Sequence, residues 1–113
     1  HLSSERRMIM AVIEVNKDNF DNEVLSSEKP VVADFYADWC GSCKALRPIL
    51  EELSGEREDV KFVSVNIDDE DELADEYDVS SIPCVVVFKN GQEAARSIGI
   101  KPKDAIEEMV GGA

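Results

Sequence analysis

VVADFYADWCGSCK, residues 31–44, is the stretch that decides the fold. Its first part is a short run of apolar, β-branched and aromatic residues, which is typical of a buried strand that stops at a turn. After the turn, residues 43–53 read CKALRPILEEL and place four aliphatic side chains on one helical face. Cys40 and Cys43 therefore lie at the junction where a strand ends and a helix begins.

This junction favours thiol chemistry. The first N–H groups of a helix have no partner within it, and with the positive end of the helix dipole they stabilise a thiolate over a thiol. A thiolate is the nucleophile of disulfide exchange, so we expect Cys40 to be prepared for attack. Cys43 follows one helical turn later and is close enough to close a disulfide with Cys40.

A static disulfide and a metal site are the alternatives for the same pair. A static bridge is uncommon in a reducing compartment. A zinc or iron–sulfur site usually has four ligands, whereas this chain has three cysteines and a single histidine, His1. The C-x-x-C spacing beside strand–helix–strand units therefore favours redox exchange.

The composition is that of an ordinary globular protein, with 43% of the 113 residues hydrophobic and 33% charged. The net charge of −13 argues against nucleic acid or an anionic membrane as partner, although solubility alone explains it. No apolar run approaches the ~18 residues that span a bilayer. The apolar patch at residues 8–13 is too short for a signal peptide with a cleavage site. We therefore expect a cytoplasmic protein.

The rest of the chain alternates strand and helix patterns. Strands are expected at residues 11–15, 31–38, 60–67, 84–88 and 93–98, and helices up to 26, then at 41–54, 68–76 and 102–110. Pro48 should kink the second helix and Gly55 should end it. Asn90-Gly91, between the last two strands, is the strongest short hairpin signal.

The resulting order, β-α-β-α-β-α-β-β-α, predicts an α/β domain in which four helices flank a five-stranded mixed sheet. The early alternation implies parallel strands, and the late hairpin implies an antiparallel edge. We expect this single domain to span residues 11–113 behind an N-terminal tail at residues 1–10. Part of that tail is expected to be artificial, with Met8 or Met10 as the natural start.

Three landmarks in this order resemble the thioredoxin family from residue 11 to residue 110. They are WCGSCK at 39–44, SIPCVVVFKNG at 81–91, and the glycine of Ile98-Gly99 beyond the hairpin. The resemblance implies the thioredoxin fold and a thiol–disulfide oxidoreductase that reduces protein disulfides through a mixed disulfide. It also implies that Cys40 is the exposed attacking thiol and Cys43 the buried resolving thiol.

Asp34 interrupts the apolar strand that precedes the cysteines. Burying a carboxylate costs free energy and should raise its pKa. The resemblance implies that this acid helps to move the proton of Cys43, and a purely structural acid is the alternative. In the family a lysine of the third strand lies near the acid, whereas here Ser64 occupies that position and Lys61 lies three residues earlier. We expect a water molecule or Ser64 to replace the lysine.

The resemblance further implies a substrate-binding surface around Cys40. A cis peptide bond would join Ile82 to Pro83 in a loop that faces the cysteines. The expected substrate-binding residues are Trp39, Gly41, Ile82, Pro83, Ile98 and Gly99, and with Ile100 they would form a flat apolar collar. The extended backbone of a substrate would pair with Ile82 there.

Two positions depart from the family pattern: Ser42 replaces the usual proline between the cysteines, and Cys84 stands where threonine is common. We expect Cys84 to be a small buried residue rather than a third redox thiol. The resemblance implies no metal or organic cofactor, a thioredoxin reductase as electron donor, and a monomer. The alternative functions are a binding or scaffold module that uses the collar for a stable partner, and a metal–sulfur site that uses Cys40, Cys43 and Cys84.

Overall fold

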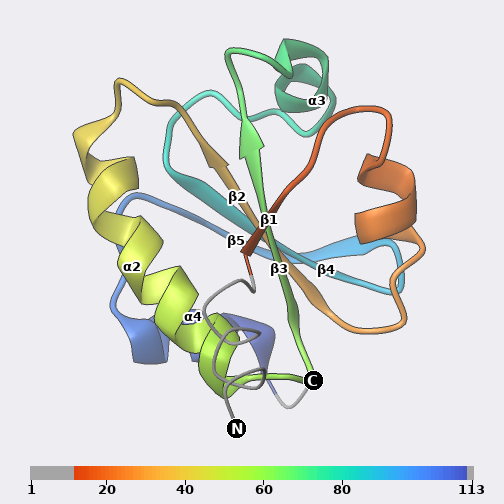
Figure 1. Cartoon of the computed structure of the whole chain (residues 1–113), viewed down its shortest axis with the longest axis vertical. Helices are drawn as coiled ribbons and strands as arrows, with labels where there is room; N and C mark the ends of the chain where they lie inside the picture. Colours follow the sequence, from red (N-terminus) through yellow and green to blue (C-terminus); the bar gives the residue numbers. More distant parts are fainter. Residues whose placement is uncertain (1–11, 112–113) are drawn as a thin grey trace, which may run out of the picture.

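A computed structural model describes residues 12–111 of the chain (Figure 1). Its elements are β1 (Val12–Glu14), η1 (Asp21–Leu25), β2 (Val31–Tyr36), α2 (Gly41–Glu56), β3 (Lys61–Asn66), α3 (Asp71–Glu76), β4 (Cys84–Lys89), β5 (Gln92–Ile98) and α4 (Lys103–Val110). This order confirms the predicted α/β arrangement of five strands and four helical segments. The expected tail, and residue 11 of the first expected strand, lie outside the described residues.

The strands form one sheet in the order β1-β3-β2-β4-β5. β1, β3 and β2 run parallel, whereas β4 is antiparallel to β2 and β5 is antiparallel to β4. β2 is the central strand, and its first five residues are fully buried, as the apolar run predicts. The strand that leads to the cysteines is thus held by neighbours on both edges.

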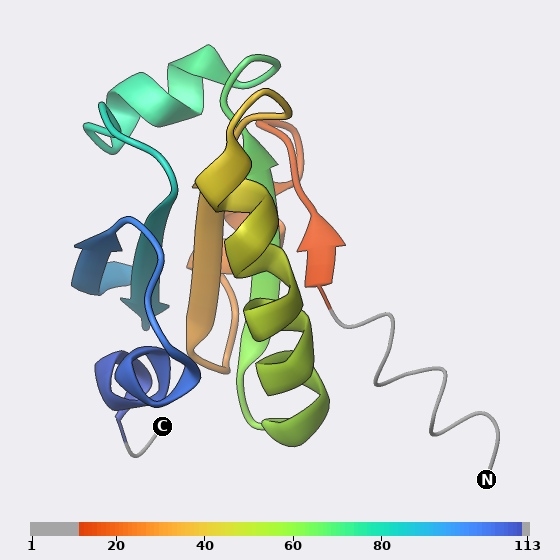
Figure 2. The ribbon, with the colours of Figure 1, turned by 90° about the vertical axis from the view of Figure 1, so that its left-hand side faces the viewer.

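Both faces of the sheet are covered by helices. Val31, Ala33 and Phe35 of β2 face η1 and α3, whereas Val32 faces α2 and α4. Figure 1 shows α2 and η1 on opposite sides of the sheet, and Figure 2 shows α2 lying along one face. Because side chains alternate along a strand, Asp34 shares the α2 face with Val32. The carboxylate is therefore buried under the helix that begins at the cysteines.

The hairpin between β4 and β5 confirms the Asn-Gly signal. Asn90 and Gly91 have φ angles of 55° and 76°, and this pair of positive values is what a type I′ turn requires. A Cβ atom on Gly91 would lie 2.9 Å from the carbonyl oxygen of Leu25 at the end of η1. The hairpin therefore needs glycine both for its backbone conformation and for its close approach to η1.

The first helical segment, η1, ends at Leu25, next to the end predicted at residue 26. The Asn16 side chain caps the chain by accepting hydrogen bonds from the backbone N–H groups two and three residues later, at 2.8 and 3.1 Å. These bonds close a turn ahead of the helical segment, which begins with the hydrogen bond from the N–H of Glu23 to the carbonyl of Asn19 and continues as η1. There the N–H of Ser26 reaches back five residues to the carbonyl of Asp21. This wide turn still buries Val24, as the apolar spacing predicts.

The prediction that Gly55 ends the second helix is wrong. α2 continues through Gly55 to Glu56, and the N–H of Arg57 then bonds the carbonyl of Leu53 at 2.8 Å. Lys103 of α4 lies 2.8 Å from the carboxylate of Glu56, and Leu53 is buried. Packing and ion pairing of the last turn thus outweigh the weak local preference of one glycine.

Within the described part of the chain, no helix combines the length and the apolar character that crossing a bilayer requires.

Candidate active site

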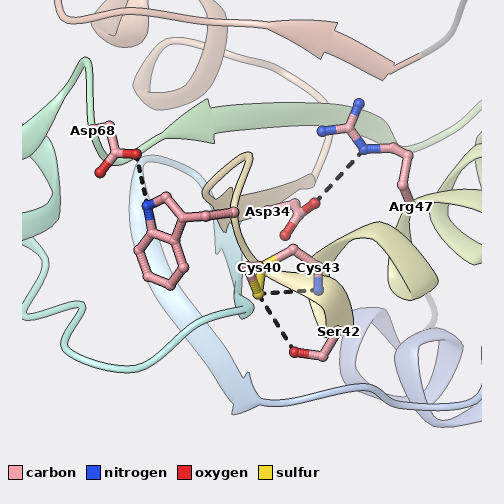
Figure 3. Close-up of a disulfide and its surroundings, with 7 residues drawn as sticks. Asp34, Cys40, Ser42, Cys43, Arg47 and Asp68 are labelled. Atoms are coloured by element: carbon pink, nitrogen blue, oxygen red, sulfur yellow. Dashed lines mark hydrogen bonds and ion pairs between the residues drawn. A yellow bond between two sulfur atoms is a disulfide. The ribbon is translucent and has the colours of Figure 1, made fainter.

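The two cysteines lie at the start of α2, where the sequence places them. Cys40 is the N-cap residue, and its Sγ accepts a hydrogen bond from the backbone N–H of Cys43 at 3.1 Å. The Cα atoms of Cys40 and Cys43 are 5.2 Å apart, and the two residues form a disulfide (Figure 3). The structure thus confirms that the pair can close a disulfide across one helical turn.

The position of Cys40 favours a thiolate when the disulfide is reduced. Its sulfur lies at the positive end of the dipole of α2, which has 16 residues, and already accepts one helix N–H. The hydroxyl oxygen of Ser42 lies 3.4 Å from the same sulfur and is a second potential donor. Cys40 and Cys43 are 7% and 3% exposed in this oxidised form, so the expected contrast in exposure is small. Position on the helix, rather than exposure, distinguishes the two sulfurs.

Asp34 is fully buried on the face of β2 that α2 covers. Burial raises the pKa of its carboxyl from 3.8 to about 7, against the opposing effect of Arg47 and with a further increase caused by the charge of Glu14. In Figure 3 the carboxylate is drawn between the disulfide and the Arg47 side chain. A carboxyl with a pKa near 7 can both accept and return a proton at neutral pH.

The two residues of β3 that the sequence suggested as partners of Asp34 are engaged elsewhere. Ser64 is the Cα partner of Asp34 in the neighbouring strand, but its hydroxyl donates to Glu14 at 3.0 Å. Lys61 bonds the carboxylate of Glu23 at 2.8 Å. The expectation that Ser64 replaces the family lysine is therefore wrong, because Glu14 on β1 takes its hydroxyl, whereas the alternative of a water molecule stays a prediction.

The cation beside Asp34 is instead Arg47, which sequence reasoning missed. Its Nε lies 3.8 Å from Oδ2 of Asp34, and its guanidinium carbon lies 5.0 Å from the centre of the Tyr36 ring. The sequence contained a signal, since Arg47 follows Cys43 by four residues and so lies on the same side of the helix. The sequence did not show how α2 crosses β2, and this crossing is what brings Arg47 to Asp34.

The expected collar residues lie on three segments, at the start of α2, in the loop before β4 and at the end of β5. The Ile82–Pro83 peptide bond is cis, and the carbonyl of Pro83 accepts a hydrogen bond from the N–H of Gly99 at 2.8 Å. Ile82 is partly buried and packs against the cluster formed by Ala37, Cys40 and Cys43. Gly99 follows β5, so this bond ties the end of β5 to the loop that precedes β4.

Three large apolar side chains of the collar are exposed to solvent. The exposed fractions are 69% for Trp39, 53% for Ile98 and 48% for Ile100. The Trp39 ring is nevertheless held in place, because its Nε1 donates to Asp68 at 2.9 Å. Gly41 is exposed as well, and a Cβ built on it would meet none of the described residues within 4 Å. Exposed apolar side chains beside a functional group are typical of a docking surface.

Cys84 is buried on the opposite face of the sheet from Asp34. It is the Cα partner of Phe35 and packs with Phe35 and Val86 in the core under η1 and α3. Burial raises the pKa of its thiol. Such a thiol is a poor nucleophile. Among residues 12–111, no three side chains of His, Cys, Asp or Glu are grouped so that they could hold a metal ion.

A Cys-x-x-C disulfide at the first turn of a helix, at the end of the central strand of a mixed five-stranded sheet, defines a thiol–disulfide oxidoreductase. Residues 11–111 match the profile of the Thioredoxin family. A thioredoxin of Mycoplasmoides gallisepticum is 44% identical to the chain over 84% of its length and 94% of the relative's. A thioredoxin of Bacillus subtilis is 43% identical, with 89% and 96% of the two chains covered.

An M-type chloroplastic thioredoxin of Chlamydomonas reinhardtii is similar too, at 43% identity over 85% of this chain and 69% of the relative. The chain belongs to the thioredoxin family. It is therefore a disulfide reductase that works through the dithiol of Cys40 and Cys43 and forms a mixed disulfide with its substrate. Its substrates are protein disulfides.

Proposed function

We propose that Cys40 is the attacking thiol, that Cys43 is the resolving thiol, and that Asp34 accepts the proton of Cys43. The Cys40 thiolate attacks one sulfur of the substrate disulfide, and the other substrate sulfur leaves with the electron pair and takes up a proton. Cys43 then transfers its proton to the Asp34 carboxylate, and its thiolate attacks Sγ of Cys40. The mixed disulfide breaks, the second substrate sulfur leaves with the electron pair and takes up a proton, and the Cys40–Cys43 disulfide remains.

One observation carries this assignment: the Cys40 sulfur accepts the N–H of Cys43 at the start of α2, while Asp34 is buried beneath the same helix. The helix end stabilises negative charge on Cys40 rather than on Cys43, which lies inside the first turn. A buried carboxyl with a pKa of about 7 is matched to proton transfer at neutral pH. The two thiols and the acid therefore have different tasks.

The collar would bind the substrate. Trp39, Ile98 and Ile100 offer exposed apolar surface, and Ile82, next to Pro83, packs against the cluster that contains Cys40. An extended substrate segment could pair with the backbone of Ile82 and place its disulfide over Cys40. Gly41 and Gly99 would leave room for it, since neither position has described atoms within 4 Å of where a Cβ would lie.

We further propose that the protein acts as a monomer in the cytoplasm, as the single domain of residues 11–113. A reducing compartment keeps such a dithiol in the reduced, active form. The electrons that each cycle consumes would come from a thioredoxin reductase, which reduces the Cys40–Cys43 disulfide again. No metal or organic cofactor takes part in the proposed steps.

Insulin reduction tests these roles, since the reduced B chain precipitates and the turbidity can be followed. With dithiothreitol as electron source, the unaltered protein should accelerate precipitation and Cys40→Ser should not. Cys43→Ser should still attack and accumulate a mixed disulfide that mass spectrometry detects. A mixed disulfide formed by Cys40→Ser but not by Cys43→Ser would reverse the roles. A wild-type protein that binds insulin without reducing it would favour the binding-module alternative.

A further inference from the structure

Arg47 is placed between the active-site helix and the buried acid. It lies on α2, four residues after Cys43, and so on the same side of the helix. Its Nε is 3.8 Å from Oδ2 of Asp34, and its guanidinium stacks on Tyr36 at 5.0 Å from the ring centre. The side chain is 30% exposed, so the guanidinium bridges solvent and the interior.

Tyr36 is itself held in place from the sheet side. Its hydroxyl donates to Glu14 of β1 at 2.8 Å, and burial, followed by this hydrogen bond, raises the pKa of Tyr36 to about 12. The ring therefore stays neutral and presents its face to the guanidinium across the physiological range. A cation over an aromatic face is attracted to it, and this contact fixes where the Arg47 charge lies.

Two other basic side chains that could be compared with Arg47 are paired with other acids. Lys61 bonds Glu23, and Arg57, at the far end of α2, bonds Asp59. Arg47 differs from them, because its Nε has no hydrogen-bond partner among the described residues, and the same is true of both carboxyl oxygens of Asp34. At 3.8 Å the two groups interact through charge rather than through a hydrogen bond.

The remaining groups that face Asp34 do not stabilise a negative charge. β1 contributes the Glu14 carboxylate, whose charge disfavours ionisation of Asp34. β3 contributes Ser64, whose hydroxyl donates to Glu14 instead, and the Cα partner on β4 is the apolar Val85. Cys84 lies on the opposite face of the sheet. Within the described residues, Arg47 is thus the group whose charge opposes the effect of burial on Asp34.

We propose that Arg47 is a positioning residue of the resolving step: it stabilises the carboxylate form of Asp34, so that the carboxylate is available to take the proton of Cys43. This inference rests on the proton-acceptor role that the proposed function gives to Asp34. Without Arg47 the buried acid stays protonated to higher pH and cannot accept a proton at neutral pH. The Cys40 attack on substrate does not involve this proton and is unaffected.

Arg47→Met tests the inference, with Arg47→Lys as the conservative variant and Arg57→Met as the matched loss of an arginine from the other end of α2. Carbon-13 NMR titration of the reduced protein follows the Asp34 carboxyl carbon directly. Arg47→Met should move the midpoint of that titration upward by about 1 pH unit, since a neighbouring cation lowers such midpoints by about 1 to 3. Arg47→Lys should restore most of the difference, and Arg57→Met should leave the midpoint where it is.

The same variants are then mixed with Ellman's reagent in a stopped-flow instrument. The first phase reports attack by Cys40, and the second reports the release of the remaining thionitrobenzoate when Cys43 resolves the adduct. For a midpoint near pH 7, a rise of 1 leaves about one carboxyl in eleven ionised at pH 7 instead of one in two. The second phase of Arg47→Met should therefore slow about fivefold at pH 7 and recover by about pH 9.

The outcomes separate this inference from the proposed function. An Asp34 midpoint that is the same in Arg47→Met and in the unaltered protein overturns the role of Arg47 and leaves that of Asp34 intact. A midpoint that moves while the second phase keeps its pH profile shows that Asp34 does not accept the proton, and the proton-transfer part of the proposed function fails. If the midpoint and the second phase shift together in Arg47→Met, and Arg47→Lys restores both, the result supports the role of Arg47 and the proton-acceptor role of Asp34.

Discussion

Asp34→Asn should stabilise the protein above about pH 5, and the gain should grow with pH. The native carboxyl is fully buried and has a pKa of about 7, raised mainly by burial, whereas the ordinary value in an exposed chain is 3.8. Between these values the folded protein holds a proton that the unfolded chain has lost. Raising the pH through this window therefore destabilises the fold, and the loss is complete above pH 7. Asparagine has no carboxyl group to ionise, so the stability of the variant does not decrease in this pH window.

The magnitude follows from the two pKa values. The full difference of about 3 corresponds to about 4 kcal/mol at high pH, and about 2 to 3 kcal/mol of it develops between pH 5 and pH 8. The buried amide of the variant has no hydrogen-bond partner in place of the carboxyl, which costs about 1 to 3 kcal/mol at every pH. We therefore expect the two proteins to be about equally stable at pH 5 and the variant to be clearly more stable at pH 8.

Urea unfolding of the oxidised proteins at constant ionic strength measures the difference, since urea adds no charge that would screen electrostatic effects. The difference between Asp34→Asn and the unaltered protein should increase by about 2 to 3 kcal/mol from pH 5 to pH 8. Asp69→Asn, at an exposed position, serves as the control and should show no such trend. A difference that stays constant with pH would refute the raised pKa of Asp34 and the reasoning built on it.

Three further predictions concern other positions. Ser42→Pro should lower the reduction potential by about 30 mV, because it stiffens the turn and removes the hydroxyl that lies 3.4 Å from the Cys40 sulfur. Equilibration with glutathione measures the potential, and an unchanged or higher value would contradict the prediction. Thiol titration of the oxidised, denatured protein should find one free thiol, and peptide mapping should assign it to Cys84. A disulfide at Cys84, or bound zinc or iron that is lost in Cys84→Thr, would contradict the view that Cys84 is a buried free thiol. Gly91→Ala should destabilise the fold by about 1 to 3 kcal/mol in thermal unfolding, since φ is +76° and the new Cβ would lie 2.9 Å from a carbonyl oxygen. Gly41→Ala, whose Cβ would have open space, is the control, and an equal loss of stability in the two variants would contradict the predicted strain at Gly91.

The features that the sequence predicted correctly depend on neighbours along the chain. The alternation of apolar segments, the helix after the cysteines and the Asn90-Gly91 hairpin are all encoded within a few residues. The Cys40–Cys43 pair was predicted for the same reason. Gly55 misled the prediction because α4 packs against the last turn of α2, a contact between residues about 50 positions apart.

The environment of Asp34 could be predicted only in part. Its burial follows from the apolar run around it, and the raised pKa follows from burial. Its cationic neighbour does not follow, because Arg47 reaches it only through the angle at which α2 crosses β2. Ser64 has the correct register but bonds Glu14 on the adjacent strand, and the pairing of β1 with β3 is a long-range contact that no local pattern contains.

The three-residue edge strand β1 has an energetic connection to the acid at the centre of the sheet. Its Glu14 accepts hydrogen bonds from Tyr36 and Ser64, and its negative charge raises the pKa of Asp34. Thermodynamic linkage makes this effect reciprocal, so that ionisation of Asp34 weakens the attachment of β1 to the sheet by the same free energy. Segments with few buried side chains open locally at low free energy, and two of the three residues of β1 are exposed. Fraying of β1 is therefore coupled to proton release at the active site, and backbone amide exchange at this edge should speed up as Asp34 ionises.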